Sequence, residues 1–341
     1  MGSVLREENG TIRQGILLCT NPRCQCEYPI IDGIPIIVAD LRTFISQNIS
    51  AIASRCDFTA EIESLIGDCC GPGSDYNVRR QYLSTYAFDH YGDLDPLEPG
   101  LTPEAPGSIV NLARKGLALA GPPPQGPILD LGCAAGRTSF ELAHAFGEMV
   151  LGIDLNLDML RTAAGALHEK SVSYPRRRVG MAYDRRGFPV DFPGAEQVDF
   201  WACDATALPF APGQFSLATS FNLMDCVGSP YDHLLALAKM LKPGTRAILS
   251  TPYDWSVSAT PVESWIGGHS QRSQNRGASE PILRSLLAGG GHPMAIEGLA
   301  LVAEVCDWPW SVRLHDRSRV QYSTHLAVVE ATGALPAETA P

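Results

Sequence analysis

The stretch Ile128-Leu129-Asp130-Leu131-Gly132-Cys133-Ala134-Ala135-Gly136-Arg137 decides how the rest of this sequence is interpreted. An apolar strand runs into a glycine-spaced turn, and a helix-compatible run from Thr138 to Phe146 follows. Glycine at 132 and 136 removes the Cβ atoms that would keep a ligand away from the backbone. The amides at the start of a helix favour an anionic or polar group. The stretch therefore predicts a strand, a turn that receives a ligand, and a helix.

Composition limits the class of protein. With 341 residues and 45% hydrophobic residues, the chain can form one large domain with an appendage, or two domains. The formal charge of -11 disfavours a broad attraction to nucleic acid or to an anionic membrane. No apolar run approaches the roughly 20 residues of a membrane helix, and the first residues lack a secretory pattern. We expect a cytoplasmic protein whose ten scattered cysteines are reduced thiols, with a homodimer left open.

Residues 1–42 are expected to form a small β module. Two short β-rich segments between Gly15 and Asp40 surround turn residues. Cys19, Cys24 and Cys26 have the close spacing of metal ligands, but a structural zinc ion needs four. The stretch 28–35 (YPIIDGIP) resembles a small zinc-ribbon-like domain that exists free as a methyltransferase activator and fused to other methyltransferases.

In that family a first cysteine pair precedes the segment, and this chain has none there. The sequence favours a degenerate, metal-free module. Zinc is left open through Cys56, Cys69 or Cys70.

A helical connector and lid is expected over residues 43–105. Helical periodicity covers about residues 43–68, and a polar and aromatic helix covers Asp75 to Gly92. Repeated Pro and Glu from Asp93 to Pro106 predict an extended loop, and an amphipathic helix is expected from Ile109 to Ala120.

The second half of the chain alternates strands and helices, which demands a mostly parallel sheet. We predict an α/β fold with a doubly wound, seven-stranded sheet over residues 106–333, and a flexible tail over 334–341. After the first strand, the expected strands are 149–154, 198–203, 215–221 and 246–251, with an antiparallel pair near 298–306 and 322–331. Helices are expected at 157–167 and 231–241.

Polar side chains stand at the ends of three of these strands. Asp154 lies roughly 20 residues beyond the glycine turn, where an acid can accept both hydroxyls of a ribose. Asp204 follows the third strand, and Asn222 and Asp225 follow the fourth. Ligands of open α/β sheets bind at such strand ends, so these side chains are expected to face one site.

The order of these signals resembles the class I S-adenosylmethionine-dependent methyltransferases. The features that carry the resemblance are DLGCAAG at 130–136, GID at 152–154, CDATALPF at 203–210, the strand ending at Asn222, and LKPG at 241–244. The resemblance implies S-adenosylmethionine as cofactor, with S-adenosylhomocysteine as product. Its glycine turn would pass the methionine part, Asp154 would hold the ribose, and Asp204 would face the adenine amino group. The expected cofactor-binding residues are Asp130, Gly132, Cys133, Ala134, Gly136, Arg137, Asp154, Leu155, Asp204, Ala205, Phe221 and Asn222.

The flanking segments resemble the methyltransferase part of ovothiol-forming enzymes. They are HYG at 90–92, TPYDW at 251–255, WIGG at 265–268 and DWPWSVR at 307–313, the last expected to join the final two strands. The resemblance implies an imidazole nitrogen of a histidine derivative as the methyl acceptor. Whether that acceptor is thiolated stays open.

Acceptor recognition is assigned to aromatic and polar side chains, because aromatic rings exclude water and stack on a planar acceptor. The expected substrate-binding residues are Tyr86, Tyr91, Asn222, Asp225, Tyr253, Trp255 and Trp265. Packing in the core is the alternative for the two tryptophans. Asn222, Asp225 and His90 are the candidates for catalytic work, although positioning alone can suffice when a sulfonium supplies the methyl group. The insertion 171–193 is expected to border the acceptor site.

The sequence thus predicts an N-methyltransferase with a small-molecule acceptor. Two alternatives remain. One is an RNA or protein methyltransferase that docks its partner through the β module. The other is a non-catalytic, cofactor-binding scaffold that activates another methyltransferase.

Overall fold

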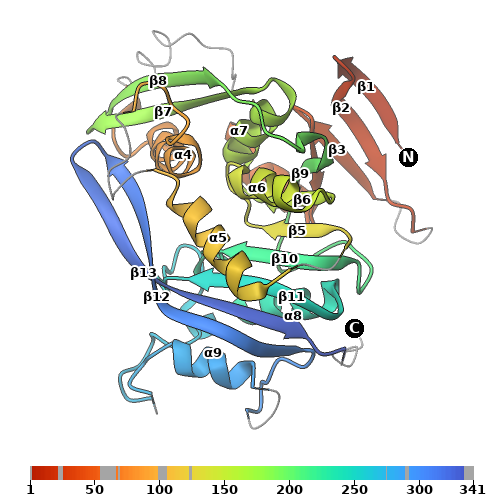
Figure 1. Cartoon of the computed structure of the whole chain (residues 1–341). Coiled ribbons are helices and arrows are strands. Elements are labelled where there is room, and N and C mark those ends of the chain that lie inside the picture. Colours follow the sequence, from red (N-terminus) through yellow and green to blue (C-terminus); the bar gives the residue numbers. More distant parts are fainter. Residues whose placement is uncertain are drawn as a thin grey trace.

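The computed structural model describes residues 2–21, 26–53, 67, 70–98, 106–122, 125–273, 275–288 and 292–333. Over these residues an 11-stranded sheet has the order β1-β2-β3-β4-β9-β6-β5-β10-β11-β13-β12, and helices cover it (Figure 1). The sheet strands are β1 Ser3–Glu8, β2 Thr11–Leu18, β3 Glu27–Ile31, β4 Ile34–Ile37, β5 Ile128–Leu131, β6 Val150–Asp154, β9 Val198–Cys203, β10 Phe215–Phe221, β11 Leu241–Thr251, β12 Leu299–His315 and β13 Ser318–Ala331. The α-helices are α1 Leu41–Gln47, α2 Ile49–Ala53, α4 Asp75–Tyr91, α5 Ser108–Ala120, α6 Arg137–Phe146, α7 Leu157–His168, α8 Pro230–Met240 and α9 Glu280–Leu286. No helix in these ranges is long and apolar enough to cross a membrane.

The sheet has a mostly parallel centre, as predicted, but with 11 strands it is larger than the predicted seven. Seven strands, from β9 to β12 in the sheet order, come from the large domain, and β1 to β4 extend the same sheet. The junction is a parallel pair in which Ile36 lies opposite Ala202 and Ile37 opposite Cys203. An edge strand leaves backbone groups unpaired, and β4 supplies the missing partner for β9. The β module therefore continues the main sheet.

The chain order of the parallel strands fixes where a ligand can bind. From β5 the chain moves outward through β6 to β9, then returns to the other side of β5 to form β10 and β11. The order of strands reverses between β5 and β10. In open α/β sheets the ligand crevice lies outside the carboxyl ends of the strands at such a switch point.

The final antiparallel pair is confirmed, but its strands are longer than predicted. The segment 307–313, expected to join the two strands, lies inside β12, where Trp308 is opposite Thr324 and Arg313 is opposite Arg319. Irregular register between Val305 and Trp308 accompanies the extension. The far end of β12 consequently reaches α4, and Arg313 stacks its guanidinium 3.5 Å from the ring centre of Phe88.

The helix α4 has the predicted bounds within one residue. It begins after Ser74, whose hydroxyl accepts a hydrogen bond from Asn77 N, and it ends before Gly92. The carboxylate of Asp89 fixes its last turn, accepting hydrogen bonds from the hydroxyl of Ser108 (2.8 Å) and from Nε1 of Trp310 (2.8 Å). Burial raises the pKa of this carboxyl to about 6. One side chain thus joins α4, α5 and β12.

The insertion 171–193 is a hairpin of β7 Ser171–Val179 and β8 Ala182–Pro189. It packs on α4 and α7, and the cavity described below has none of its residues in its lining, so it does not border that cavity. Two of its arginines are paired with acids. Arg186 pairs with the buried Asp95, and Arg176 pairs with Glu98. The acidic loop before α5 neutralises these two side chains.

The connector is described only in part. Helices α1 and α2 occupy its start, whereas 54–66 and 68–69 lie outside the described residues. Of the cysteines considered for zinc, Cys24, Cys56 and Cys69 lie outside them as well. Zinc binding by the module stays a prediction.

Candidate active site

A cavity of about 900 Å³ opens at the carboxyl edge of the central strands. Pockets of roughly 300–1,000 Å³ are typical of small-molecule and cofactor sites. Its wall combines residues after β5, β6, β9 and β10 with one face of α4 and with α1 and α2. Of the expected site residues, those that line it are His90, Tyr86, Gly132, Ala134, Asp154, Leu155, Asp204, Ala205, Phe221 and Asn222.

The glycine turn approaches the cavity closely. Gly132 has φ +68°, and a Cβ there would lie 2.8 Å from Leu223 Cδ1, so a side chain has neither the space nor the backbone conformation. Ala134 also has a positive φ, +47°. Its amide donates to Asp154 Oδ2 at 3.0 Å, a contact between the turn and the next strand that stabilises this conformation.

Two amides near the start of α6 have protein partners. Ala134 N is bonded to Asp154, and Arg137 N, at the start of α6, donates to His90 Nδ1 at 3.2 Å. The polar groups that these amides bind therefore come from β6 and α4 of the protein itself. A phosphate cradle needs such amides free.

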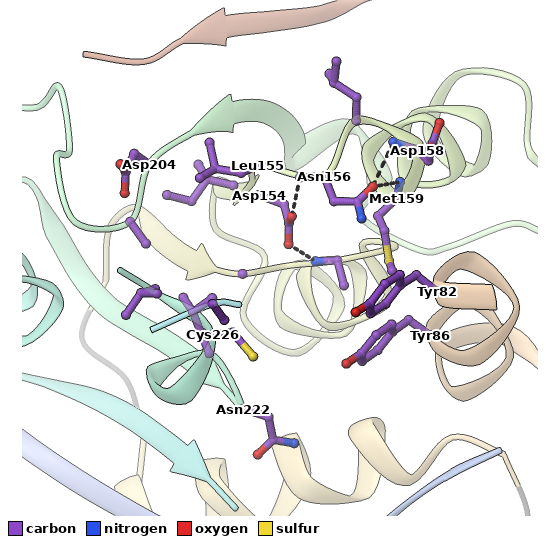
Figure 2. A pocket seen from close by; sticks show the side chains of 18 of the residues that line it. Tyr82, Tyr86, Asp154, Leu155, Asn156, Asp158, Met159, Asp204, Asn222 and Cys226 are labelled. Carbon is purple, nitrogen blue, oxygen red and sulfur yellow. Dashed lines mark hydrogen bonds between the residues drawn. The ribbon is translucent and has the colours of Figure 1, made fainter. Parts of the chain in front are cut away.

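Carboxylates mark the ends of β6 and β9 on the cavity wall. Asp154 Oδ1 accepts the amide of Asn156 at 2.7 Å, and its side chain faces the cavity beside Leu155 (Figure 2). Burial raises the pKa of the Asp154 carboxyl, and its amide hydrogen bonds oppose that rise. Asp204 Oδ1 accepts both the amide and the hydroxyl of Thr206, at 2.8 and 2.7 Å. Both acids are held in fixed orientations.

Asn222 presents an unused hydrogen-bond donor. Its φ is +51°, and its amide donates to Ser250 O at 2.9 Å. Its side-chain oxygen accepts the Ser250 hydroxyl at 2.9 Å, which orients the amide group and leaves the buried Nδ2 without a partner among the described residues. An unpaired buried donor costs about 1–3 kcal/mol, which an acceptor atom on a ligand would offset.

His90 is a neutral donor and is not a suitable general base. Burial, with a smaller contribution from the nearby Arg137 guanidinium, lowers its pKa to about 3. Because Nδ1 accepts the Arg137 amide, the ring proton must sit on Nε2. The catalytic role suggested by the sequence would need a free basic nitrogen here. A hydrogen bond from Nε2 to a ligand is the role that the geometry allows.

We expect the His90 ring to stay neutral, with its proton on Nε2, from pH 8 down to pH 5. The folded-state pKa lies below this window, so the ring gains no proton within it. Nitrogen-15 NMR of the histidine rings checks both points, with His90→Gln to assign the signal. A His90 signal that titrates in this window, or that shows the Nδ1–H tautomer, contradicts the assignment.

One face of α4 forms a wall that the sequence did not fully reveal. Asp75, Arg79, Tyr82, Tyr86 and His90 all line the cavity, at spacings of three or four residues. Figure 2 shows Tyr82 and Tyr86 side by side, with Met159 near Tyr82. The helical spacing from Tyr86 would have indicated Tyr82 and Arg79.

The sequence did not assign Arg79 or Trp310 to the site. Arg79 donates to both oxygens of Asp158, each at 2.7 Å, which joins α4 to α7 at the cavity. Trp310 belongs to the segment 307–313, which the sequence singled out only for the resemblance and as a connection between the last two strands. It lines the cavity because that segment continues β12 instead.

Four expected cofactor contacts do not line the cavity. Buried Asp130 accepts hydroxyl hydrogen bonds from Thr138, Ser139 and Thr219 at 2.6–2.7 Å, and so ties β5 to α6 and β10. Cys133 packs in the core.

The other two are Gly136 and Arg137. A Cβ on Gly136 would meet Phe200 at 2.6 Å, so this glycine permits packing of helix against sheet. Arg137 pairs with Asp93 and Glu141, each at 2.9 Å.

Most of the expected acceptor wall does not line this cavity. The Tyr91 hydroxyl donates to Ala135 O at 2.6 Å, and the Tyr253 hydroxyl is bonded to His325. The rings of Trp255 and Trp265 stack on each other, 6.0 Å apart. Tyr91 is buried, the other three side chains are half-buried, and none of the four residues lines the cavity.

Asp225 does not line the cavity either. Its carboxylate accepts the amide of Asp254 at 2.7 Å and so supports the loop after β11. Burial raises its pKa to about 6. The Asp225 side chain, a catalytic candidate from the sequence, thus stabilises the loop after β11.

The fold and the cavity together define a doubly wound α/β domain with a ligand site at its switch point. Residues 129–249 match the family model for a methyltransferase domain. By this match, residues 129–249 carry a methyltransferase domain.

Among characterised proteins, the chain is similar to the ubiquinone biosynthesis O-methyltransferases of Bordetella pertussis and Bordetella parapertussis. Each is 32% identical over 124 residues, which is 36% of this chain and 42% of the relative. The match therefore spans less than half the length of these relatives.

Two solved structures are also similar. One is the complex between the Haloferax volcanii Trm112 methyltransferase activator and a putative methyltransferase, with TM-score 0.41 and 18% identity over 64% of this chain and 88% of that one. The other is the Haemonchus contortus phosphoethanolamine N-methyltransferase 2 in complex with S-adenosyl-L-methionine, with TM-score 0.37 and 21% identity over 52% of this chain and 35% of that one.

Proposed function

We propose that this chain binds S-adenosylmethionine in the cavity and transfers its methyl group to a small molecule. We further propose that the accepting atom is an imidazole nitrogen of histidine or of a histidine derivative. The observation that carries the first part is the character of the cavity wall. Its carboxylates and its occupied turn amides suit a cationic cofactor without phosphates.

The charges on the wall support a sulfonium cofactor over a dinucleotide. Asp75, Asp89, Asp154, Asp158 and Asp204 line the cavity, and the one arginine beside them among the described lining residues pairs with Asp158. A carboxylate-rich wall attracts a positive sulfonium and repels pyrophosphate.

The residues at the strand ends fit the parts of such a cofactor. Asp154, with both oxygens oriented by backbone amides, would accept the ribose hydroxyls. The Asp204 carboxylate would accept a hydrogen bond from the adenine amino group. Asn222 Nδ2 and His90 Nε2 are donors that would bind the cofactor carboxylate or the acceptor. When bound, the cofactor supplies an electrophilic methyl group on a sulfonium.

The protein's own contribution would be positioning. Three aromatic side chains would exclude water from the space between the methyl group and the accepting atom, and would hold a planar acceptor. They are Tyr82 and Tyr86 from α4 and Trp310 from β12. Neither His90 nor Asp225 is placed as a base, so the acceptor would bind with its lone pair free. A neutral ring nitrogen of imidazole meets that requirement at physiological pH.

The acceptor proposal rests on these aromatic side chains and on the resemblance of the flanking segments to ovothiol-forming enzymes. An oxygen atom is the competing acceptor, because the characterised relatives are named as O-methyltransferases. Methylation of RNA or protein and a scaffold without catalysis are the remaining alternatives.

Mass spectrometry of methyl transfer tests the proposal. The purified chain is incubated with S-adenosylmethionine and, separately, with histidine, thiohistidine, histidine-containing dipeptides, a catechol and bulk RNA. We expect a methylated imidazole, and less product with Asp154→Ala when the cofactor is limiting. Product in the catechol or RNA lane alone overturns the imidazole acceptor. Cofactor binding without product in any lane supports the scaffold alternative.

A further inference from the structure

Three side chains with metal-binding atoms meet on the final hairpin, outside the proposed methyl-transfer cavity. They are Glu304 and Cys306 from β12 and His325 from β13, and their ligand atoms all lie within 4.8 Å of one another. Glu304 and Cys306 are two residues apart, which places them on the same face of the strand. None of the three lines the cavity.

A cation from α9 already contacts two of the three side chains of this cluster. Arg284 Nε lies 2.9 Å from both carboxylate oxygens of Glu304, and Nη2 lies 3.1 Å from Cys306 Sγ. The Arg284 side chain is 39% exposed, so it can turn away from the cluster towards solvent. The three ligand groups therefore form a cation site whose present occupant is replaceable. In Figure 1, α9 lies beside β12.

The imidazole of His325 is oriented as a metal ligand requires. Its Nε2 lies 3.0 Å from Glu304 Oε2, and its Nδ1 lies 2.7 Å from the Tyr253 hydroxyl. In the structure the Glu304 carboxylate accepts from Nε2, so the ring proton lies there and Nδ1 accepts from the Tyr253 hydroxyl. A metal needs the other tautomer, in which Nδ1 donates to the Tyr253 oxygen and the Nε2 lone pair faces the cluster. Metal-bound histidines almost always have their second nitrogen held in this way.

We propose that Glu304, Cys306 and His325 bind one zinc ion, which displaces the Arg284 guanidinium. A donor set of one sulfur, one nitrogen and one carboxylate oxygen favours zinc over magnesium or calcium. Three protein ligands leave the fourth tetrahedral position for water. Binding forms the three metal bonds and breaks the Arg284 contacts. The His325 ring proton moves from Nε2 to Nδ1, and the Cys306 thiol proton is released to solvent.

Cobalt(II) as a spectroscopic probe tests the proposal on the full chain. The reference protein carries Cys19→Ser, Cys24→Ser and Cys26→Ser, so that cysteines of the β module add no signal. We expect one equivalent of cobalt to produce a near-ultraviolet thiolate-to-cobalt absorption band, which zinc then removes by competition. Cys306→Ser should abolish the band, whereas the matched control Cys70→Ser, at another exposed cysteine, should retain it.

Two further variants separate a metal site from a nonspecific thiol adduct. Arg284→Leu should bind cobalt about threefold more tightly, because a competing ion pair is removed. Tyr253→Phe should bind about tenfold more weakly, because the His325 ring loses its second hydrogen bond. A missing band, a band that persists in Cys306→Ser, or unchanged affinity in both further variants overturns the proposal.

Discussion

Asp154→Ala is expected to weaken S-adenosylmethionine binding by more than about tenfold, because two charge-assisted hydrogen bonds to the ribose would be lost. The carboxylate is held towards the cavity by the amides of Ala134 and Asn156, so its position does not depend on a flexible loop. Isothermal titration calorimetry measures the change.

The same substitution also frees the Ala134 amide, so a second variant is needed. Asp154→Asn keeps an oxygen for one amide but loses the negative charge, and we expect most of the loss in affinity to remain. Asp191→Ala is the matched control, since Asp191 has a side chain 79% exposed in a surface ion pair with Lys170. Unchanged affinity in Asp154→Asn, with an unchanged unfolding temperature, would remove Asp154 from the cofactor site.

Ile36→Ala is expected to lower the free energy of unfolding by about 2–5 kcal/mol, the usual range for truncating a fully buried isoleucine. Ile36 is 0% exposed and lies opposite Ala202 in the pair of β4 and β9. Because that pair makes the β module part of the main sheet, the loss should appear in the main unfolding transition. Chemical denaturation followed by tryptophan fluorescence measures it.

Leu5→Ala is the control for this experiment. Leu5 lies in the same module but is 64% exposed, so its truncation should change stability by no more than about 0.5 kcal/mol. A separate early transition in Ile36→Ala, with the main transition unmoved, would show that the module unfolds independently.

Much of the large domain could be predicted from the sequence, because its elements depend on local signals. The stretch 128–146 forms the predicted strand, turn and helix. Asp154, Asp204 and Asn222 stand where the ends of parallel strands bring them, and all three line one cavity. Strand ends of a parallel sheet share an edge, so spacing along the chain was enough to bring them together.

The positions of the aromatic side chains could not be predicted from the sequence. Tyr86 and Tyr91 both belong to α4, but residues five positions apart lie on different faces of a helix. Tyr86 therefore faces the cavity, whereas Tyr91 is buried against Ala135. Trp255 and Trp265 looked equally suited to an acceptor wall and instead stack on each other. Composition cannot distinguish an aromatic residue at a site from one in the core.

The sequence by itself determined the order of strands and helices, the glycine turn and the acids that end the strands, because each follows from local conformation and periodicity. Only the tertiary structure decided three other features. The β module joins the main sheet through β4, the turn amides are occupied by Asp154 and His90, and Trp310 reaches the cavity from β12. Each depends on contacts between residues far apart in the chain, and whether such partners meet is decided by packing and hydrogen bonding of the whole fold.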